Sequence, residues 1–421
     1  MRKRLFYGWR MVGAASGIQF LQAAMLYQAL GAYVAILTEE KGWSKTSLSA
    51  GSALQATEAA LIGPLLGWII DRFGAQTMIR FGVLLFGAGF IAFSFIDTLP
   101  QFYMAIILIA LGSSMCGFFP LNVAIVNWFK KYRARALSSI ALGLALGGAF
   151  VPVVAWSMHY FGWRATAFGC GVVAIVVGLP LAMVFKRRPE DHGETLDGLP
   201  PPDPASKSEG GSHDPSDDIE FTARQALATP AFWLLGFGHG FALFVVTAVN
   251  VHAISHMKEG LGYTVGEASL VITLMTAFQV VGVSFGWWAG DRFQKRLVAA
   301  TCMLMHAAGL LMLTYAVSPF MLVAFAVLHG SAWGLRGPFM QALRADYFGR
   351  RSIGTIMGLS SLLVVIGQIG GPLVAGYFAD VTGNYRFGFT ILACLAASGS
   401  VLFVLARAPK VPDRPPKPQA A

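Results

Sequence analysis

Charged residues are scarce in this sequence. Asp, Glu, Lys and Arg make up only 12% of its 421 residues, whereas a soluble domain usually carries about a quarter. Apolar residues account for 56% of the chain, and its mean hydropathy is +0.62. This composition excludes an ordinary soluble globular protein and indicates a chain that lies in a membrane.

Cysteine is scarce as well, and clusters of catalytic or metal-binding side chains are missing. The four cysteines lie in apolar runs, which argues against a disulfide framework of the secreted kind. His252 and His256 are four residues apart, but the sequence offers no third ligand beside them. We therefore expect no metal and no cofactor. Because the apolar runs also lack a group of Ser, His and Asp residues, we do not expect an enzyme.

Segments of alternating polar and apolar residues, the pattern of a membrane β-barrel, are missing too. Apolar runs of about 20 residues recur instead, and each is long enough to cross a hydrocarbon core of about 30 Å. We therefore predict an all-α integral membrane protein with twelve transmembrane helices. Their expected positions are 11–36, 47–70, 77–97, 102–128, 136–160, 164–185, 230–255, 266–289, 297–317, 320–343, 354–378 and 386–406.

The basic residues that give the chain its net charge of +10 are unevenly placed. When the N-terminus is assigned to the inside, nearly all of them fall in the inner loops, which is the positive-inside pattern. It predicts a multi-pass protein of the cell inner or plasma membrane with both termini in the cytoplasm, and it argues against a nucleic-acid partner. The few basic residues of the expected outer loops are Lys41, Lys45, Arg164, Lys258 and Arg386.

Several motifs occur twice, at a separation of about 220 residues. Asp71-Arg72-Phe73 returns as Asp291-Arg292-Phe293, and Pro152 returns as Pro372. A parallel repeat in a membrane chain predicts two six-helix bundles related by a pseudo-two-fold axis, with a binding site between them. We expect a first bundle over 1–186 and a cytoplasmic linker over 187–229, largely disordered with a short helix. A second bundle over 230–408 and a disordered tail over 409–421 follow.

A local pattern between the second and third spans leads to a known family. Gly67 is followed by Asp71-Arg72-Phe73-Gly74, which resembles the signature of the major facilitator superfamily. Asn127-Trp128-Phe129, with Arg133 and Arg135 after it, is also similar to that superfamily. Tyr7-Gly8-Trp9-Arg10 and the Gly-Trp-Ser after span one look like its monocarboxylate and oxalate–formate branch.

The resemblance implies two bundles that rock about a central cavity, which spans 1, 4, 7 and 10 line. It also implies that the Asp-Arg loops latch neighbouring helices on the cytoplasmic side. Charges at helix ends can pair or separate as the ends move, which supports a latch independently, although they are otherwise solvated loop charges. In the second copy Gln294 replaces the Gly that closes the motif. The gate residues expected in this way are Asp71, Arg72, Asp291, Arg292 and Arg133.

Arg336 is the one basic residue that we place well inside a span. A guanidinium keeps its charge in a protein, so it is expected to face a cavity, an anion or a carboxylate. Trp333 and His329 lie on the same helical face as Arg336. A forked cation in an apolar pocket suits a small organic carboxylate, while a structural ion pair or a position near the inner surface is the alternative.

Glu58 is the only carboxylate that we place well inside a span. It is a candidate for proton coupling or for the counter-charge of Arg336, and otherwise a protonated residue bonded between helices. Further residues are candidates for substrate contact, although polar side chains in spans often only bond across helices. These residues are Gln22, Tyr27, His239, Asn250, Phe118 and Asn122.

These observations predict a secondary active transporter and not a channel, because no ring of charges or filter is evident. We expect transport of a small organic anion of the monocarboxylate type by alternating access, with proton coupling (symport) or exchange (antiport). Relatives of this branch often carry a charge in span eight or a Lys in span one or eleven, whereas this chain has only Glu267 at the edge of span eight and no such Lys. The wide apolar and aromatic content suggests the alternative, an exporter of neutral or amphipathic compounds. We expect the substrate, protons and the lipid bilayer as partners, no nucleic acid, and a monomer.

Overall fold

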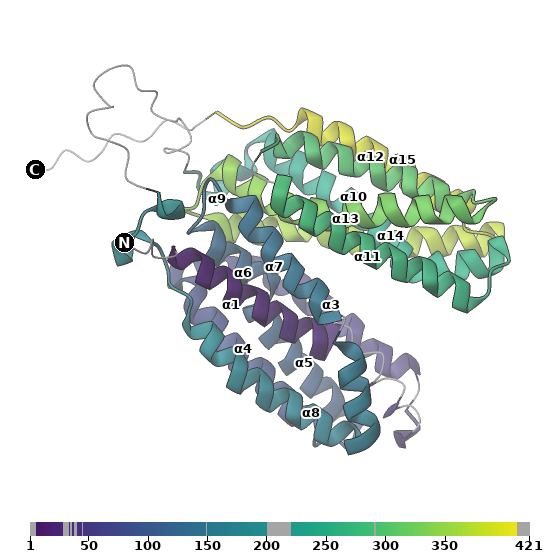
Figure 1. Cartoon of the computed structure of the whole chain (residues 1–421), viewed down its shortest axis with the longest axis horizontal. Helices are drawn as coiled ribbons and strands as arrows, with labels where there is room; N and C mark the ends of the chain where they lie inside the picture. Colours follow the sequence, from purple (N-terminus) through teal and green to yellow (C-terminus); the bar gives the residue numbers. More distant parts are fainter. Residues whose placement is uncertain are drawn as a thin grey trace, which may run out of the picture.

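The fold consists of helices in two bundles, one from each half of the chain (Figure 1). The computed structural model describes residues 6–27, 33, 36–37, 40–43, 45–148, 150–199, 220–289 and 292–410, and no strand occurs among them. The bundles meet at the end where the N-terminus and α9 (Ala223–Leu227) lie, and they diverge toward the opposite end (Figure 1). We call these the terminal end and the far end.

The N-terminal bundle holds the helices that precede residue 184. Gly117 adopts an extended conformation and divides the predicted fourth span into two helices. Gly162 has a positive φ of 78° inside α8 and separates the end of the predicted fifth span from the sixth. The helices are α1 (Tyr7–Gln22) with a π-helical continuation over Ala23–Tyr27, α3 (Lys45–Phe73), α4 (Ala75–Phe93), α5 (Leu99–Cys116), α6 (Phe118–Val126), α7 (Arg133–Gly148) and α8 (Val151–Met183).

The C-terminal bundle follows the same order with fewer breaks. The Thr229 side chain accepts a hydrogen bond from the Phe232 amide, and Pro230 occupies the first helical position, so α10 begins with an N-cap and a first-turn proline. The helices are α10 (Pro230–Ser255) with a π-helical turn over His256–Gly260, α11 (Val265–Ala289), α12 (Lys295–Thr314), α13 (Pro319–Phe348), α14 (Ile353–Thr382) and α15 (Arg386–Leu405).

The sequence repeat is reproduced in the packing of the helices. In the first bundle α1 packs against α7, α3 against α5, and α4 against α8. In the second bundle the equivalent pairs are α10 with α14, α11 with α13, and α12 with α15. Between the bundles α3 packs against α14, and α7 packs against α11. Each bundle therefore encloses its own apolar core, and the interface between them uses equivalent helices from the two copies.

The backbone shows the repeat at its loops as well. Gly42 and Gly262, which are 220 residues apart, have φ values of 64° and 78°. A side chain with a Cβ rarely adopts this region, so glycine is needed in both copies. Gly74 also has a positive φ of 86°, whereas Gln294 has a φ of −63°. The replacement of that Gly in the second copy is thus explained by a different loop conformation.

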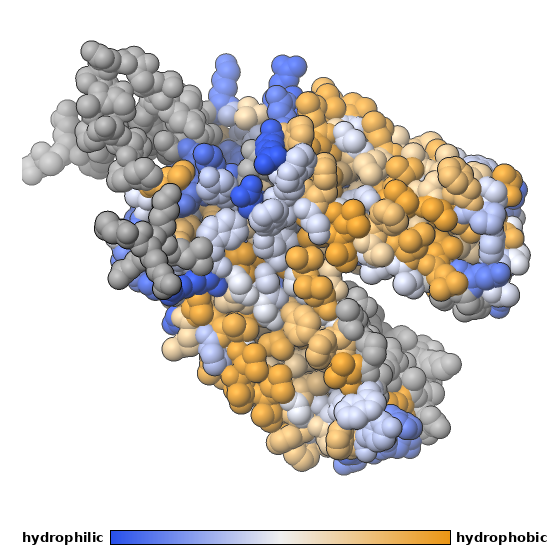
Figure 2. All heavy atoms as spheres, in the orientation of Figure 1, coloured by the Kyte–Doolittle hydropathy of each residue, from blue (hydrophilic) through white to orange (hydrophobic). Residues whose placement is uncertain are grey.

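The outer surface of both bundles is apolar between the two ends. Large apolar side chains are exposed on helices of both bundles, among them Leu61, Leu270 and Leu373. Figure 2 shows these apolar flanks, with polar residues gathered toward the ends of the bundles. By length and composition alone, nine helices among the described residues could cross a membrane. The other three predicted spans correspond to α1, α3 and α7, which these criteria do not select.

The linker between the bundles is described in part. Residues 190–199 lie on the N-terminal bundle, where the Asp197 carboxylate accepts hydrogen bonds from the amides of Lys130, Lys131 and Tyr132. The short helix α9 precedes α10, and its first turn is capped by Thr222. Residues 200–219 and the tail from 411 onward, for which we predicted disorder, lie outside the described residues.

Candidate functional site

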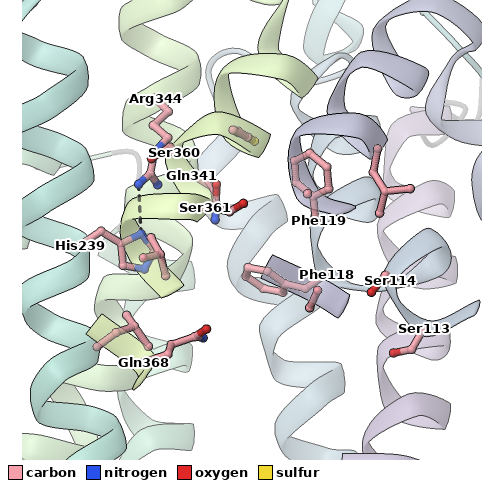
Figure 3. A pocket seen from close by; sticks show the side chains of 16 residues that line it. Ser113, Ser114, Phe118, Phe119, His239, Gln341, Arg344, Ser360, Ser361 and Gln368 are labelled. Carbon is pink, nitrogen blue, oxygen red and sulfur yellow. Dashed lines mark hydrogen bonds between the residues drawn. The ribbon is translucent and has the colours of Figure 1, made fainter. Parts of the chain in front are cut away.

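A cavity of about 320 Å³ lies between the two bundles. It is within the range of small-molecule sites, which are typically about 300–1,000 Å³. Helices α3, α5 and α6 supply one wall, and α10, α13 and α14 supply the other (Figure 3). The lining residues are Ala59, Gly63, Leu66, Ser113, Ser114, Phe118, Phe119, His239, Leu243, Gln341, Arg344, Met357, Ser360, Ser361, Val364 and Gln368.

Among the described residues that line the cavity, Arg344 on α13 is the only charged one. Its Nε donates a hydrogen bond to the Ser360 hydroxyl at 3.0 Å, and its Nη2 lies 3.1 Å from Nδ1 of His239. Its Nη1 donates to the Met340 carbonyl at 3.3 Å. Three bonds to uncharged groups therefore hold the guanidinium in place, and none of them neutralises it.

Polar groups are concentrated on the C-terminal wall. Gln341, Ser361 and Gln368 lie beside Arg344 and His239, as Figure 3 shows. All of these side chains can donate a hydrogen bond, so this wall can surround an anion with donors. The arrangement matches a carboxylate better than a cation, because no carboxylate lines the cavity among the described residues.

The N-terminal wall is aromatic and weakly polar. Phe118 and Phe119 begin α6 directly after the break at Gly117, and Ser113 and Ser114 lie in the last turn of α5 before it (Figure 3). Helix α6 thus restarts in a position that turns two aromatic rings toward the cavity. This wall can hold the apolar part of a ligand whose anionic part lies at Arg344.

Glu58 lies next to this wall on α3. Its Oε2 accepts a hydrogen bond of 2.9 Å from the hydroxyl of Ser114, which lines the cavity. Its Oε1 is buried without a hydrogen-bond partner among the described residues. Glu58 is therefore one side chain away from the cavity and lies on the wall opposite Arg344.

Arg336, the cation predicted from the sequence, does not line the cavity. It is 2% exposed, and its Nε and Nη1 have no partner among the described residues. Arg336 is therefore enclosed by packed side chains and does not face the cavity. A direct contact between Arg336 and substrate stays a prediction, and this conformation does not provide it.

The two residues predicted to share the face of Arg336 also lie away from the cavity. His329 is fully buried, and its Nδ1 lies 3.2 Å from Nδ1 of His306 on α12. Trp333 is half-buried and packs against the core of the C-terminal bundle. The structure therefore brings Phe118 and His239 to the cavity and leaves Arg336, Trp333 and His329 in the packing around it.

The remaining residues that were predicted to contact the substrate are spread over several helices. Gln22 is buried and donates to the Ser113 carbonyl and to Sγ of Cys116, which ties α1 to α5. Asn122 is buried on α6, and its amide atoms have no partner among the described residues. Asn250 is exposed and does not line the cavity. The side chain of Tyr27 lies outside the described residues.

Sequence reasoning missed Arg344. The tenth span was predicted to end at residue 343, so Arg344 was counted among the basic residues of the inner loops, and this was wrong because α13 continues to Phe348. The sequence did contain a pattern that points to Arg344. The face defined by His329, Trp333, Arg336 and Met340 has spacings of four, three and four, and one further step of four reaches Arg344.

The terminal end of the cavity is closed by contacts between the bundles. The carboxylate of Asp71, at the end of α3, accepts hydrogen bonds from the amides of Gly354 and Thr355 and from the Thr355 hydroxyl at 3.0, 2.8 and 2.7 Å. These groups belong to the first turn of α14, where a carboxylate is favoured by the free amides and the helix dipole. Asp71 thus joins the two bundles.

A second set of contacts joins α7 to the end of α13. Arg133 is buried and forms an ion pair with Asp346, whose other carboxylate oxygen lies 2.9 Å from Nζ of Lys295. Arg135 lies over the ring of Trp287 on α11, with 4.8 Å between the guanidinium carbon and the ring centroid. Asp346 therefore binds one cation from each half of the chain.

The other predicted gate residues have local contacts. Arg72 lies over the rings of Trp68 and Phe73 on its own helix. Arg292 lies over the ring of Trp288 at 4.6 Å. Asp291 lies outside the described residues.

The chain is similar to known proteins over nearly its whole length. The family profile described as Major Facilitator Superfamily matches residues 15–251 and 232–421. Among curated proteins, monocarboxylate transporter 13 of Bos taurus is 23% identical over 94% of this chain and 89% of its own length.

Two solved structures share the fold at low sequence identity. The proton:xylose symporter XylE superposes with a TM-score of 0.74 at 14% identity, over 96% of both chains. The human organic anion transporter MFSD10 superposes with a TM-score of 0.70 at 15% identity, over 94% of this chain and 99% of that one. These likenesses show the fold alone. They confirm the predicted all-α membrane fold with two six-helix bundles.

Proposed function

The chain belongs to the Major Facilitator Superfamily, and we propose that within it this protein carries a small organic anion by alternating access. Its place in the family makes it a secondary transporter and not an enzyme. The family expected from Asp71-Arg72-Phe73-Gly74 is thereby confirmed.

The observation that carries the proposal is the uncompensated charge of Arg344. The guanidinium lies in the wall of the central cavity, bonded to Ser360 and His239, and no carboxylate lines that cavity among the described residues. A buried cation is costly unless an anion approaches it. A substrate carboxylate can supply that charge, while Phe118 and Phe119 contact its apolar part.

The substrate class that fits this cavity is a monocarboxylate with a short apolar or aromatic body. Among the described residues one guanidinium faces the cavity, so one anionic group can be paired, and the opposite wall is aromatic and only weakly polar. The bovine relative is named as a monocarboxylate transporter, which agrees with this class. A dicarboxylate would leave its second charge against Phe118 and Phe119, which is unfavourable.

We propose that the terminal end is cytoplasmic, from the positive-inside distribution of Lys and Arg. In this conformation the hollow between the bundles then opens to the outside (Figure 2), and the contacts of Asp71 and Asp346 close the inside. Transport follows when these contacts break and the far ends of the bundles approach each other. Glu58, beside the cavity, is the group that we propose to carry a coupled proton.

Uptake into proteoliposomes tests the proposal. The purified protein is offered radiolabelled monocarboxylates, dicarboxylates, aromatic acids and neutral amides of the same acids, with and without an inward proton gradient. We expect saturable uptake of monocarboxylates and little uptake of the matched amides. Preferential uptake of the neutral amides would instead support the second candidate function, an exporter of neutral or amphipathic compounds, which the aromatic wall of Phe118 and Phe119 favours.

A further inference from the structure

The chain that follows α8 packs at the terminal end on the loop between α6 and α7, which covers residues 127–132. Residues 190–199 form two short 3-10 turns there, and we call them the docked segment. The Asp197 amide donates a hydrogen bond to the Trp128 carbonyl at 3.1 Å. The ring of His192 stacks on that of Trp128, with 6.5 Å between the centroids. The docked segment is therefore attached to this loop at two points.

Asp197 has an unusual conformation within the docked segment. Its φ is 59°, and among the described residues it is the only one other than glycine with a positive φ. Residues with a Cβ adopt this region rarely, and the conformation persists only where the surroundings hold it. The residue is also 7% exposed although it lies in a surface segment. A strained and buried carboxylate at such a place points to a specific role.

The Asp197 carboxylate binds the backbone just ahead of α7. Its Oδ2 accepts hydrogen bonds from the amides of Lys130 and Lys131 at 3.0 and 2.8 Å, and its Oδ1 accepts one from the Tyr132 amide at 3.1 Å. Helix α7 begins at Arg133. Amides at this place have no preceding helical turn to supply acceptors, and a helix start favours an anion. Asp197 therefore fixes the shape of the loop.

The same loop contacts the C-terminal bundle. The Asn127 carbonyl accepts a hydrogen bond of 2.7 Å from Nη1 of Arg350. Arg133, which follows the loop, forms the ion pair with Asp346, and its Nε donates to the Phe129 carbonyl at 2.9 Å. One loop carbonyl thus receives an arginine from the other bundle, and a second orients the arginine that reaches across to it.

The docked segment also has a direct contact with the C-terminal bundle. Oε1 of Glu190 lies 2.9 Å from Nη2 of Arg350, but the Glu190 side chain is 49% exposed. Exposed ion pairs contribute little to stability. The buried Asp197 carboxylate, with three amides bound, is therefore the stronger link, and it acts through the loop.

We propose that Asp197 is a positioning residue of the closed terminal end. Its carboxylate holds residues 127–132 in the shape that presents the Asn127 carbonyl to Arg350 and Arg133 to Asp346. Loss of the carboxylate releases the loop and favours separation of the bundles at the terminal end. The inference rests on the alternating-access part of the proposed function. It adds a gate residue from the segment between the two bundles.

The test uses the full chain in nanodiscs and three variants of the docked segment. Asp197→Asn keeps the size of the side chain but places a donor where the loop amides need an acceptor. Asp197→Gly removes the carboxylate and relieves the positive φ, so a residue that served only the turn would tolerate it. Asp191→Asn is the matched control, because Asp191 is exposed in the same segment.

The measurement is the distance between spin labels at Tyr160→Cys and Val317→Cys near the far ends. The background is Cys394→Ser, which removes the exposed native cysteine. Thermal unfolding confirms that each variant is folded. We expect the ratio of longer to shorter far-end distances to fall by about fivefold in both Asp197 variants, because hydrogen bonds to a charged group are lost from the closed arrangement. Asp191→Asn should leave the ratio unchanged.

A second background tests whether Asp197 acts through the loop. Asp346→Asn/Arg350→Gln removes both partners that the loop binds in the C-terminal bundle. Residues that act through one network are not additive, so Asp197→Asn should have little further effect there. Gly358→Ala adds a Cβ at 2.6 Å from the Gly63 carbonyl oxygen, in a different helix pair, and should still shorten the far-end distances in this background.

Three results would overturn the proposal. They are unchanged distances in a folded Asp197→Asn or Asp197→Gly protein, an equal change in the Asp191→Asn control, and an undiminished effect of Asp197→Asn in the second background. If Gly358→Ala changes the distances and Asp197→Asn does not, only the role of Asp197 fails. If neither changes them, the alternating-access proposal fails with it. No substrate is present, so the proposed substrate class has no influence on the result.

Discussion

Nη2 of Arg344 on α13 lies 3.1 Å from Nδ1 of His239 on α10. A guanidinium has no acceptor, so the imidazole accepts this hydrogen bond through Nδ1 and carries its proton on Nε2. His239 is therefore neutral in this arrangement. It orients the guanidinium and leaves its full positive charge in the cavity wall, which is the property that an anion site requires.

Replacement of Arg344 tests the anion site directly. Arg344→Gln keeps a polar side chain but removes the charge and the fork, so the apparent affinity for a monocarboxylate should fall by about 100-fold, from a contribution of about 3 kcal/mol. Arg344→Lys keeps the charge and loses the fork, so its loss should be about tenfold. Concentration-dependent uptake in proteoliposomes measures both values.

Arg224→Gln is the control for this series, because Arg224 is exposed on α9 and does not line the cavity. Its uptake should equal that of the unaltered protein. Full uptake by a folded Arg344→Gln protein would remove Arg344 from the substrate site. If the Arg336→Gln protein loses uptake and the Arg344→Gln protein does not, the substrate-binding cation is Arg336, the residue predicted from the sequence.

His239 should affect affinity less than Arg344 does. His239→Phe removes the acceptor that orients Nη2, while Ser360 still holds Nε. One lost hydrogen bond of about 1 kcal/mol should raise KM by about fivefold with little change in kcat. His239→Gln restores an acceptor and should recover part of the loss. Equal KM values for the two variants would show that the hydrogen bond has no part in binding.

The sequence was sufficient for the fold but only partly for the site. Apolar runs and the repeat predict the bundles because membrane helices satisfy their backbone internally and must be long and apolar. Arg336 and Arg344 both lie on α13, yet only Arg344 lines the cavity. Which of the two arginines lines the cavity depends on how α13 packs against α10 and α12. The spacing of residues along one helix does not specify that packing. Phe119 on α6 and Ser360 on α14 were missed because helical spacing does not specify how those helices pack either.

Glu58 gives a prediction about coupling. Its Oε2 is bonded to Ser114 at the cavity, and its other oxygen is buried without a partner, so protonation and substrate binding can influence each other there. Glu58→Gln mimics the protonated form. We expect this variant to retain counterflow exchange of substrate but to lose the stimulation of uptake by an inward proton gradient.

Ser114→Ala serves as the companion variant, because it removes the hydroxyl that binds Glu58 and leaves the carboxylate. It should keep gradient-driven uptake with an altered pH dependence. If the Glu58→Gln protein still accumulates substrate under a proton gradient to the unaltered level, Glu58 does not carry the coupled proton.

The close approach of α3 and α14 at the terminal end gives the last prediction. A Cβ on Gly358 would lie 2.6 Å from the Gly63 carbonyl oxygen and 3.0 Å from Cα of Pro64, which are backbone atoms that cannot move independently of α3. Gly358→Ala should therefore separate the bundles at this end at a cost of about 1–3 kcal/mol to the closed arrangement. The control is Gly169→Ala on α8, where an added Cβ meets nothing within 4 Å. Spin labels at Tyr160→Cys and Val317→Cys should show a shift to shorter far-end distances for Gly358→Ala only. An unchanged distance distribution in a folded Gly358→Ala protein would mean that α3 and α14 do not form the moving interface, since a wedge between them would then have no effect on the far ends.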